Sequence, residues 1–283
     1  MTTQNSALGE GTTMNNFIDA RGFTFEPFVH PFHEDGHGDS GTLEIATSKA
    51  NPDEQYIIKS KFPELGCNEL MYHRVAKALG LYTQEAKLIN GNKAYRRAAA
   101  IRYVPNARLF NLATGTPENF RTFFEFEALF VILNEDDSHE YYLDEQDRLF
   151  KLDNAASFTV SENTINWFAG DAVSHFFIPD IDAPLNAVGY SYYSITLQSY
   201  KEKHGQAAAD AYLSLIERFA DFDKSVLADA YAALDKQYSR MLKMYYSRCI
   251  DIRKETCRRF LKEVGDADAK MTCSDNLGVD SDV

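Results

Sequence analysis

The sequence lacks a long apolar run, and this absence excludes a membrane-spanning helix. A helix that crosses a bilayer needs about 18 or more apolar residues in succession, and the 283 residues contain no such run. The N-terminal stretch MTTQNSALGEGTTMNN also lacks a basic region followed by an apolar one, so it does not have the form of a secretory signal. We therefore expect a cytoplasmic protein without a membrane partner.

Cysteine is scarce, and basic residues are fewer than acidic ones, with 29 Lys and Arg against 42 Asp and Glu. The cysteines lie at positions 67, 249, 257 and 273 and show none of the paired spacing of zinc sites. A reduced, cytoplasmic setting explains them most simply. The net charge of −13 argues against a broad nucleic-acid-binding surface, because phosphate backbones need neutralising cations.

Apolar and aromatic residues are plentiful. They make up 45% of the chain, with 20 phenylalanines and 16 tyrosines, enough for the core of one large domain or two closely packed lobes. The two ends of the chain differ from this apolar body. Residues 1–20 are polar and rich in Gly, Thr and Asn, and residues 272–283 are polar and acidic. We expect both ends to be flexible.

The first half of the chain is typical of β-structure with one helix. Short β-rich runs occur at residues 23–25, 42–45, 55–59, 85–89 and 94–103. Between them, residues 68–79 carry apolar side chains at helical spacing, and Gly80 follows as a helix-ending glycine. Asn90-Gly91-Asn92 is a strong turn signal between the last two strands.

The second half is mainly helical. Thr116 and Pro117 predict a helix start, and the aromatic-rich helix that follows should run into Asn134. A short hairpin is expected over residues 141–143 and 148–152, and residues 190–264 should be helical, with one long amphipathic segment from about Lys224. This order indicates an α+β, bilobal, protein-kinase-like fold, with a β-rich N-lobe over 21–105 and a helical C-lobe over 106–271.

Charged residues recur at the points where this fold would bring its elements together. Lys59 ends a predicted strand, and Glu69 lies ten residues later near a helix start. The acidic run 134–139 follows the aromatic-rich helix, although acidic residues oppose the dipole at a helix C-terminus. Asp153 comes about sixteen residues after Asp137, a distance that a hairpin spans while bringing its ends together.

Such a set suits phosphoryl transfer, which requires positioning and charge neutralisation rather than covalent chemistry. A cation is needed on the phosphates, a carboxylate beside the attacking hydroxyl, and oxygen ligands for Mg²⁺. Each residue has an ordinary explanation when taken alone: Lys59 could be a surface lysine, and the acidic run could be a solvated turn.

The motifs resemble those of HipA-like kinases, bacterial serine/threonine kinases that commonly belong to toxin–antitoxin systems. The resemblance covers roughly residues 40–160. It rests on the segments Tyr56–Lys59, Asn68-Glu69, Val75–Leu81, Leu133–Tyr142 and Lys151–Phe158. It implies an ATP- and Mg²⁺-dependent kinase that phosphorylates serine or threonine hydroxyls of a protein, with an antitoxin or regulatory protein as a further partner.

The resemblance also assigns roles to single residues. Lys59 would bind the nucleotide phosphates, and Glu69 would orient Lys59. Asp137 would be the catalytic base, with His139 as a structural partner of its loop, and Asp153 would be the main Mg²⁺ ligand. The sequence departs from the family at Tyr142, which stands where the family has a metal-binding asparagine. A neighbour, Asn154 or Asp136, would then have to replace that ligand.

A glycine-rich segment precedes the strand that begins near Thr42. Its residues Gly36, Gly38, Ser40 and Gly41 would let backbone amides approach phosphates, and Ser40 is a candidate autophosphorylation site. A flexible hairpin loop explains the same glycines equally well. The backbone around residues 101–105 would connect the lobes and could hydrogen-bond adenine.

Two other functions remain open at this stage. Tyr142 favours a nucleotide-binding pseudokinase or interaction module, in which turnover is weak or lost. The same core also serves small-molecule phosphotransferases.

Overall fold

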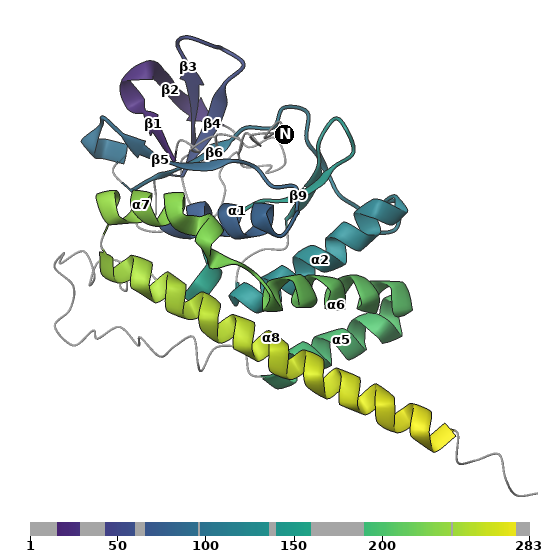
Figure 1. Ribbon diagram of the computed structural model, residues 1–283. Coiled ribbons are helices and arrows are strands. Elements are labelled where there is room, and N and C mark those ends of the chain that lie inside the picture. The colour runs from purple at the N-terminus through teal and green to yellow at the C-terminus, as the bar shows by residue number, and fades with distance from the viewer. Residues whose placement is uncertain are drawn as a thin grey trace, which may run out of the picture.

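The computed structural model describes residues 16–28, 43–59, 66–95, 97–135, 140–159, 190–238 and 240–275. Figure 1 shows a sheet at one end of the molecule and a group of helices at the other. This arrangement confirms the predicted α+β class with a β-rich N-lobe and a helical C-lobe. Among the described residues, no helix combines the length and apolar character that a bilayer crossing requires.

The N-lobe is built on a six-stranded sheet in the order β1-β5-β6-β4-β3-β2. All neighbouring strands are antiparallel except β1 and β5, which are parallel. The strands are β1 (Phe17–Asp19), β2 (Phe23–Phe28), β3 (Leu43–Ser48), β4 (Gln55–Lys59), β5 (Ala86–Asn90) and β6 (Ala99–Arg102). Alternation along β4 buries Tyr56 and Ile58 on one face, which directs Lys59 to the other face.

Two features of this lobe differ from the expectations. Strand β1 pairs with β5 over Phe17–Asp19, so the predicted flexible arm 1–20 overlaps an ordered strand. The run 94–103 is not one strand, because a 3-10 helix (Lys93–Tyr95) precedes β6. Arg97 has a φ of 69°, a left-handed conformation that interrupts an extended chain. The predicted pairing of the last two strands is confirmed, because β5 and β6 are antiparallel neighbours. Gly91, at a φ of 79°, begins their connection, which is longer than the predicted turn and includes the 3-10 helix.

Helix α1 (Gly66–Ala78) lies in the middle of the molecule. Every residue from Gly66 to Ala76 is buried, because the sheet covers one side and the C-terminal helices the other. The predicted helix is confirmed, and Gly80 follows it with a φ of 83°. A helix buried on all sides needs little amphipathic character, so its polar residues, including Asn68 and Glu69, face partners rather than water.

The C-lobe begins with a small sheet and helix α2 (Pro117–Leu133). The hydroxyl of Thr116 accepts a hydrogen bond from the Asn119 amide at 3.1 Å, and Pro117 occupies the first turn, as predicted. Asn134 ends the helix with a φ of 50°. The predicted hairpin is confirmed as β8 (Tyr141–Leu143) and β9 (Leu149–Lys151), which β7 (Arg108–Leu109) extends to three strands.

Within the described part of the C-lobe, four further helices follow: α5 (Tyr190–His204), α6 (Gln206–Ala220), α7 (Ala228–Gln237) and α8 (Arg240–Asp275). The expected single amphipathic segment from Lys224 is wrong. A 3-10 helix over Lys224–Leu227 and a bend at Tyr238, where φ is −119° and ψ is −92°, divide it. The Tyr238 hydroxyl donates a hydrogen bond at 2.8 Å to the Arg97 carbonyl, so a tertiary contact fixes this bend.

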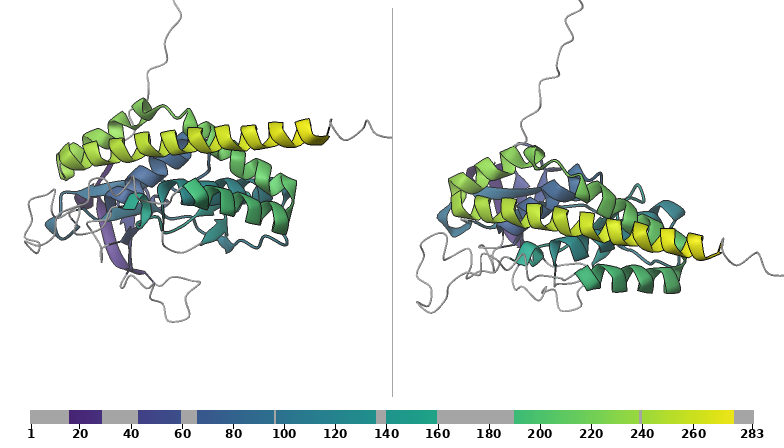
Figure 2. Two further views of the ribbon diagram at one scale, coloured as in Figure 1. Left: turned by 90° about the horizontal axis from the view of Figure 1, so that it is seen from below. Right: turned by 60° about the horizontal axis from the view of Figure 1, so that its bottom comes forward.

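Helix α8 is longer than expected. It continues past Gly265 to Asp275, so its last turn overlaps the predicted tail 272–283. In Figures 1 and 2 it runs along the other helices and projects beyond them at its C-terminal end. One face of α8 is buried between its start and Phe260, with Tyr246, Ile250 and Phe260 fully inside. This face closes the main core against α1, α2 and α6.

Candidate active site

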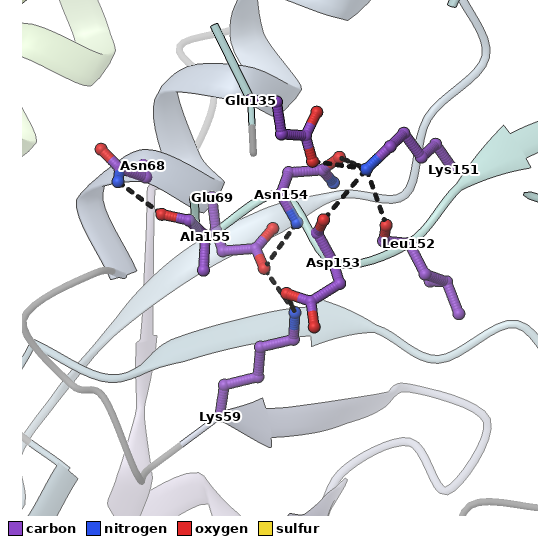
Figure 3. Close-up of polar contacts among 9 residues, drawn as sticks. All are labelled: Lys59, Asn68, Glu69, Glu135, Lys151, Leu152, Asp153, Asn154 and Ala155. Carbon is purple, nitrogen blue, oxygen red and sulfur yellow. Dashed lines mark hydrogen bonds and ion pairs between the residues drawn. The ribbon is translucent and has the colours of Figure 1, made fainter. Parts of the chain in front are cut away.

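Three of the predicted site residues meet at the junction of the two lobes (Figure 3). The Lys59 ammonium, at the end of β4, lies 2.6 Å from a carboxylate oxygen of Glu69 in the first turn of α1. The same ammonium lies 2.7 Å from a carboxylate oxygen of Asp153, which follows β9. Lys59 and Asp153 are 94 positions apart in the sequence, so this contact links two distant segments of the chain.

The three side chains differ in their access to solvent. The Glu69 side chain is 3% exposed, whereas those of Lys59 and Asp153 are 22% and 32% exposed. Glu69 also accepts a hydrogen bond from the Asn154 amide at 3.2 Å. Glu69 is therefore an internal anchor, and Lys59 and Asp153 are the members that a ligand can reach.

Electrostatics hold the cluster in its charged form. Burial acts to lower the pKa of Lys59, but the carboxylates of Asp153 and Glu69 outweigh it, and the net pKa is raised. The Lys59 ammonium in turn lowers the pKa of Asp153, against the opposing effect of burial. The carboxylates of Glu69 and Asp153 carry two negative charges, and the Lys59 ammonium neutralises only one of them. The cluster is therefore suited to bind a further cation beside Asp153.

The backbone at Asp153 is in an uncommon conformation. Its φ of 55° places it in the left-handed region, which among residues other than glycine only Asn and Asp visit routinely. Such outliers persist where the surroundings enforce them. Here the turn after β9 is held on both sides, by Glu69 at the Asn154 amide and by Asn68 at the Ala155 carbonyl.

Asn68 connects this turn to the C-terminal helix α8. Its side-chain amide donates to the Ala155 carbonyl, and its side-chain oxygen accepts from the Tyr246 hydroxyl. The same hydroxyl lies 3.1 Å from the Cys67 sulfur. Cys67, Asn68 and Tyr246 are buried, and their contacts connect α8 to α1 and, through Asn68, to the turn that carries Asp153.

Asn154, a predicted metal ligand, lies next to the cluster with its side chain engaged elsewhere. It is buried, and its side-chain oxygen accepts a hydrogen bond from the Lys151 ammonium at 3.3 Å. An oxygen that faces an ammonium is a poor ligand for a dication as long as that contact persists. Among the described residues, no group of three or more His, Cys, Asp or Glu side chains is placed to hold a metal ion.

Tyr142, the residue at the family's asparagine position, belongs to the core of the small sheet. It pairs with Phe150 across the hairpin, and the two rings stack with centroids 6.1 Å apart. It is 2% exposed, and burial raises its pKa to about 12. Tyr142 is therefore a neutral packing residue in β8.

The remaining predicted site residues lie outside the described part of the chain. These are Asp137 and His139, with Asp136 beside them, and the loop residues Gly36, Gly38, Ser40 and Gly41. Their roles stay predictions. Glu135 and Glu140, which flank the first group, are described.

The connector predicted around residues 101–105 joins the two sheets. Strand β6 ends at Arg102, whose carbonyl accepts from the Gln84 side chain at 2.9 Å. The Tyr103 amide donates to the Gln55 carbonyl at 2.9 Å, and the Tyr103 ring contacts Phe28 edge-on. The structure therefore places this segment between the lobes, and adenine binding there stays a prediction.

Sequence reasoning missed a second buried ion pair, Lys151 with Glu135. Both side chains are 0% exposed, and the Lys151 ammonium contacts a Glu135 carboxylate oxygen. Burial raises the pKa of Glu135 to about 7, although Lys151 opposes the shift. The signal was present in the sequence, because Lys151 stands within the apolar strand Leu149–Leu152, and a lysine is almost never fully buried unless it is paired.

Comparison with known proteins supports the fold. No protein-family model and no curated protein sequence matches the chain. Among solved structures, the chain is similar to CtkA, a proinflammatory kinase of Helicobacter pylori, with a TM-score of 0.52 and 15% sequence identity. The match covers 80% of this chain and 93% of that one. At this identity the likeness shows a kinase-like bilobal fold and leaves the activity to be argued from the site.

Proposed function

We propose that the protein is a HipA-like kinase that transfers the γ-phosphate of ATP to a serine or threonine hydroxyl of a protein, with Mg²⁺. The observation that carries the proposal is the cluster of Lys59, Glu69 and Asp153. In a kinase-like fold these positions are a strand lysine, a helix glutamate and a metal-binding aspartate. An antitoxin or regulatory partner belongs to the same proposal and rests on the sequence resemblance. The cytoplasmic location also belongs to it and rests on the four scattered cysteines.

Each residue has a chemical role in the proposal. Lys59 leaves its shared position between two carboxylates to contact the nucleotide phosphates, and buried Glu69 keeps the ammonium aimed at them. Asp137 takes the proton of the acceptor hydroxyl, and His139 supports its loop. Bound Mg²⁺ supplies neutralisation of the charge that develops on the transferred phosphoryl group.

The residues present fit a magnesium-bound nucleotide in part. The Asp153 carboxylate is a hard oxygen donor, is partly exposed, and is held in place by its turn. Tyr142 packs inside β8 and the Asn154 oxygen faces Lys151, so neither supplies a second protein ligand in this arrangement. We therefore assign the second ligand to Asp136, as the sequence resemblance allows.

Nucleotide titrations test the proposal directly. We expect ATP with Mg²⁺ to raise the melting temperature of the wild type, and Lys59→Ala to weaken ATP binding about tenfold or more, since it removes a charged phosphate contact. Lys49→Ala, which changes an exposed lysine bonded to the Arg21 carbonyl, is the matched control. A wild type whose melting temperature responds to neither ATP nor Mg²⁺ would contradict the proposal.

Phosphate transfer is measured separately with labelled ATP, on the protein itself and on a panel of protein and small-molecule acceptors. We expect Asp137→Ala to abolish transfer and to leave ATP binding nearly unchanged, because the base acts on the acceptor hydroxyl. Label on a small molecule alone would assign the protein to the small-molecule phosphotransferases.

The burial of Tyr142 in β8 favours a second function. With a packing residue in place of a metal ligand, the protein could be a nucleotide-binding pseudokinase or interaction module. ATP binding without transfer, unchanged by Asp137→Ala, is the result that identifies this alternative.

A further inference from the structure

The Lys151 ammonium is the centre of a buried network directly behind Asp153 (Figure 3). It contacts a Glu135 carboxylate oxygen, the carbonyls of Leu152 at 3.2 Å and Asp153 at 3.0 Å, and the Asn154 side-chain oxygen at 3.3 Å. A single side chain thus holds oxygens from three consecutive residues. None of these contacts involves the Asp153 carboxylate, which bonds Lys59 on the other side.

The two carbonyl contacts have a consequence for the backbone. In an extended chain successive carbonyls point in opposite directions, so one cation can bind two in succession only if the residue between them is bent. That residue is Asp153, and its φ of 55° is the bend. The Lys151 ammonium therefore stabilises the left-handed conformation of Asp153 directly.

The bend decides where the Asp153 carboxylate points. With the carbonyls directed at Lys151, the Asp153 side chain faces Lys59 and solvent, and the next amide, that of Asn154, faces Glu69. An extended Asp153 would turn the carbonyls, the carboxylate and this amide away from these partners together. The same turn thus binds the buried Lys151 ammonium through its carbonyls and presents the partly exposed Asp153 carboxylate on its other side.

We propose that Lys151, paired with Glu135, is a positioning residue that holds the Asp153 turn in the conformation that presents the Asp153 carboxylate to a metal ion. The metal-binding part of this inference rests on the proposed function, whereas the conformational part does not. A buried pair is costly to maintain, and apolar replacements of similar volume are often neutral or stabilising. Glu135 has one further oxygen without a hydrogen-bond partner among the described residues, so fold stability alone is a weak explanation for the pair.

A double variant separates the two explanations. Lys151→Met with Glu135→Leu removes both buried charges, so the urea midpoint of unfolding at pH 7.5, where Glu135 is mainly ionised, should stay close to that of the wild type. Hydrogen exchange of the 152–156 segment, measured by mass spectrometry without ligand, should nevertheless become about tenfold faster or more, the factor that corresponds to one lost hydrogen bond to a charged group. The gain in ATP affinity that Mg²⁺ confers should fall by a similar factor, with little change in ATP affinity without Mg²⁺.

The matched control is Lys224→Met with Asp251→Leu, which removes a partly exposed ion pair between the 3-10 helix at Lys224–Leu227 and α8. It should leave both the exchange of residues 152–156 and the Mg²⁺ effect unchanged. If the variant with Lys151→Met and Glu135→Leu does not fold, Lys151→Gln with Glu135→Gln serves instead. The glutamine side chain at position 151 is shorter than lysine and cannot reach the carbonyls of both Leu152 and Asp153.

Exchange and Mg²⁺ dependence equal to those of the wild type in a folded double variant would overturn the inference. A wild type without Mg²⁺-dependent ATP binding would instead contradict the proposed function. The ligand-free exchange of residues 152–156 would then decide the role of Lys151 by itself.

Discussion

Glu135 shows how a single buried carboxyl can set the pH dependence of stability. Burial raises its pKa from the ordinary 4.5 to about 7, so between these values the folded protein holds a proton that the unfolded chain has released. Stability contributed by that proton is therefore lost as the pH rises from about 4.5 to 7. The Lys151 ammonium acts against this shift, and the pKa of about 7 is the net result of the two effects.

We expect the free energy of unfolding of the wild type to fall by about 3 kcal/mol from pH 4.5 to 7.5 relative to the Lys151→Met, Glu135→Leu variant, which lacks this carboxyl. Urea unfolding at closely spaced pH values measures the difference. A constant difference between the two proteins over this range would show that Lys151 keeps Glu135 ionised throughout.

At the scale of single residues, the sequence predicted the site residues whose positions in strands and helices are recognisable. It did not predict the residues whose role depends on their being buried. Lys59, Glu69 and Asp153 follow from a strand end, a helix start and a hairpin, and the structure brings them together. Glu135 was placed in a solvated or catalytic acidic run, but its side chain is fully buried against Lys151. Burial depends on what packs above a residue, which local sequence does not encode.

At the scale of elements, α1 is held by more than the sheet. The Tyr246 hydroxyl on α8 donates to Asn68, which in turn bonds the Ala155 carbonyl. Removing that hydroxyl takes a hydrogen-bond donor away from a buried amide oxygen, a loss that costs about 1–3 kcal/mol. It also loosens the link from α8 to the Asp153 turn.

Tyr246→Phe should therefore lower the free energy of unfolding by that amount and speed the exchange of residues 153–156. Tyr231→Phe is a suitable control, because the Tyr231 hydroxyl is buried without a hydrogen-bond partner among the described residues. Equal effects of the two substitutions would mean that the hydroxyl of Tyr246 does not couple α8 to the turn.

Elements with strong local signals were predictable, and those fixed by distant contacts were not. The Thr116–Pro117 helix start, the Gly80 helix end and the β8–β9 hairpin are encoded by capping and turn residues. Strand β1 exists because it pairs with β5, and the bend between α7 and α8 at Tyr238 is tied to Arg97. Both partners are far away in the sequence.

At the scale of the whole molecule, contacts from the C-terminal helices join the lobes through α1 and the sheet. Arg218 on α6 donates to the Leu79 carbonyl just after α1 and forms an ion pair at 2.9 Å with buried Glu125 on α2. Tyr238 bonds the Arg97 carbonyl, and the Asn16 side chain before β1 bonds the Asp229 carbonyl on α7 at 2.9 Å. Helix α1 contributes to the main core, which it shares with the C-lobe helices, and the apolar cluster confined to the N-lobe sheet is much smaller than this shared core.

We therefore expect the lobes to unfold together. Arg218→Ala removes a contact to α1 and leaves Glu125 with the exposed Arg121, 3.3 Å away, as its remaining ion-pair partner, and should cost about 2–3 kcal/mol. Hydrogen exchange in rising urea should show the amides of β5 and β6 losing protection at the same midpoint as those of α6, in both wild type and variant.

Lys243→Ala, which breaks an exposed ion pair at 3.5 Å with Asp235, should shift neither midpoint appreciably. Separate midpoints for the sheet and for α6 in the wild type would show instead that the lobes are independent folding units, and that α1 belongs to only one of them.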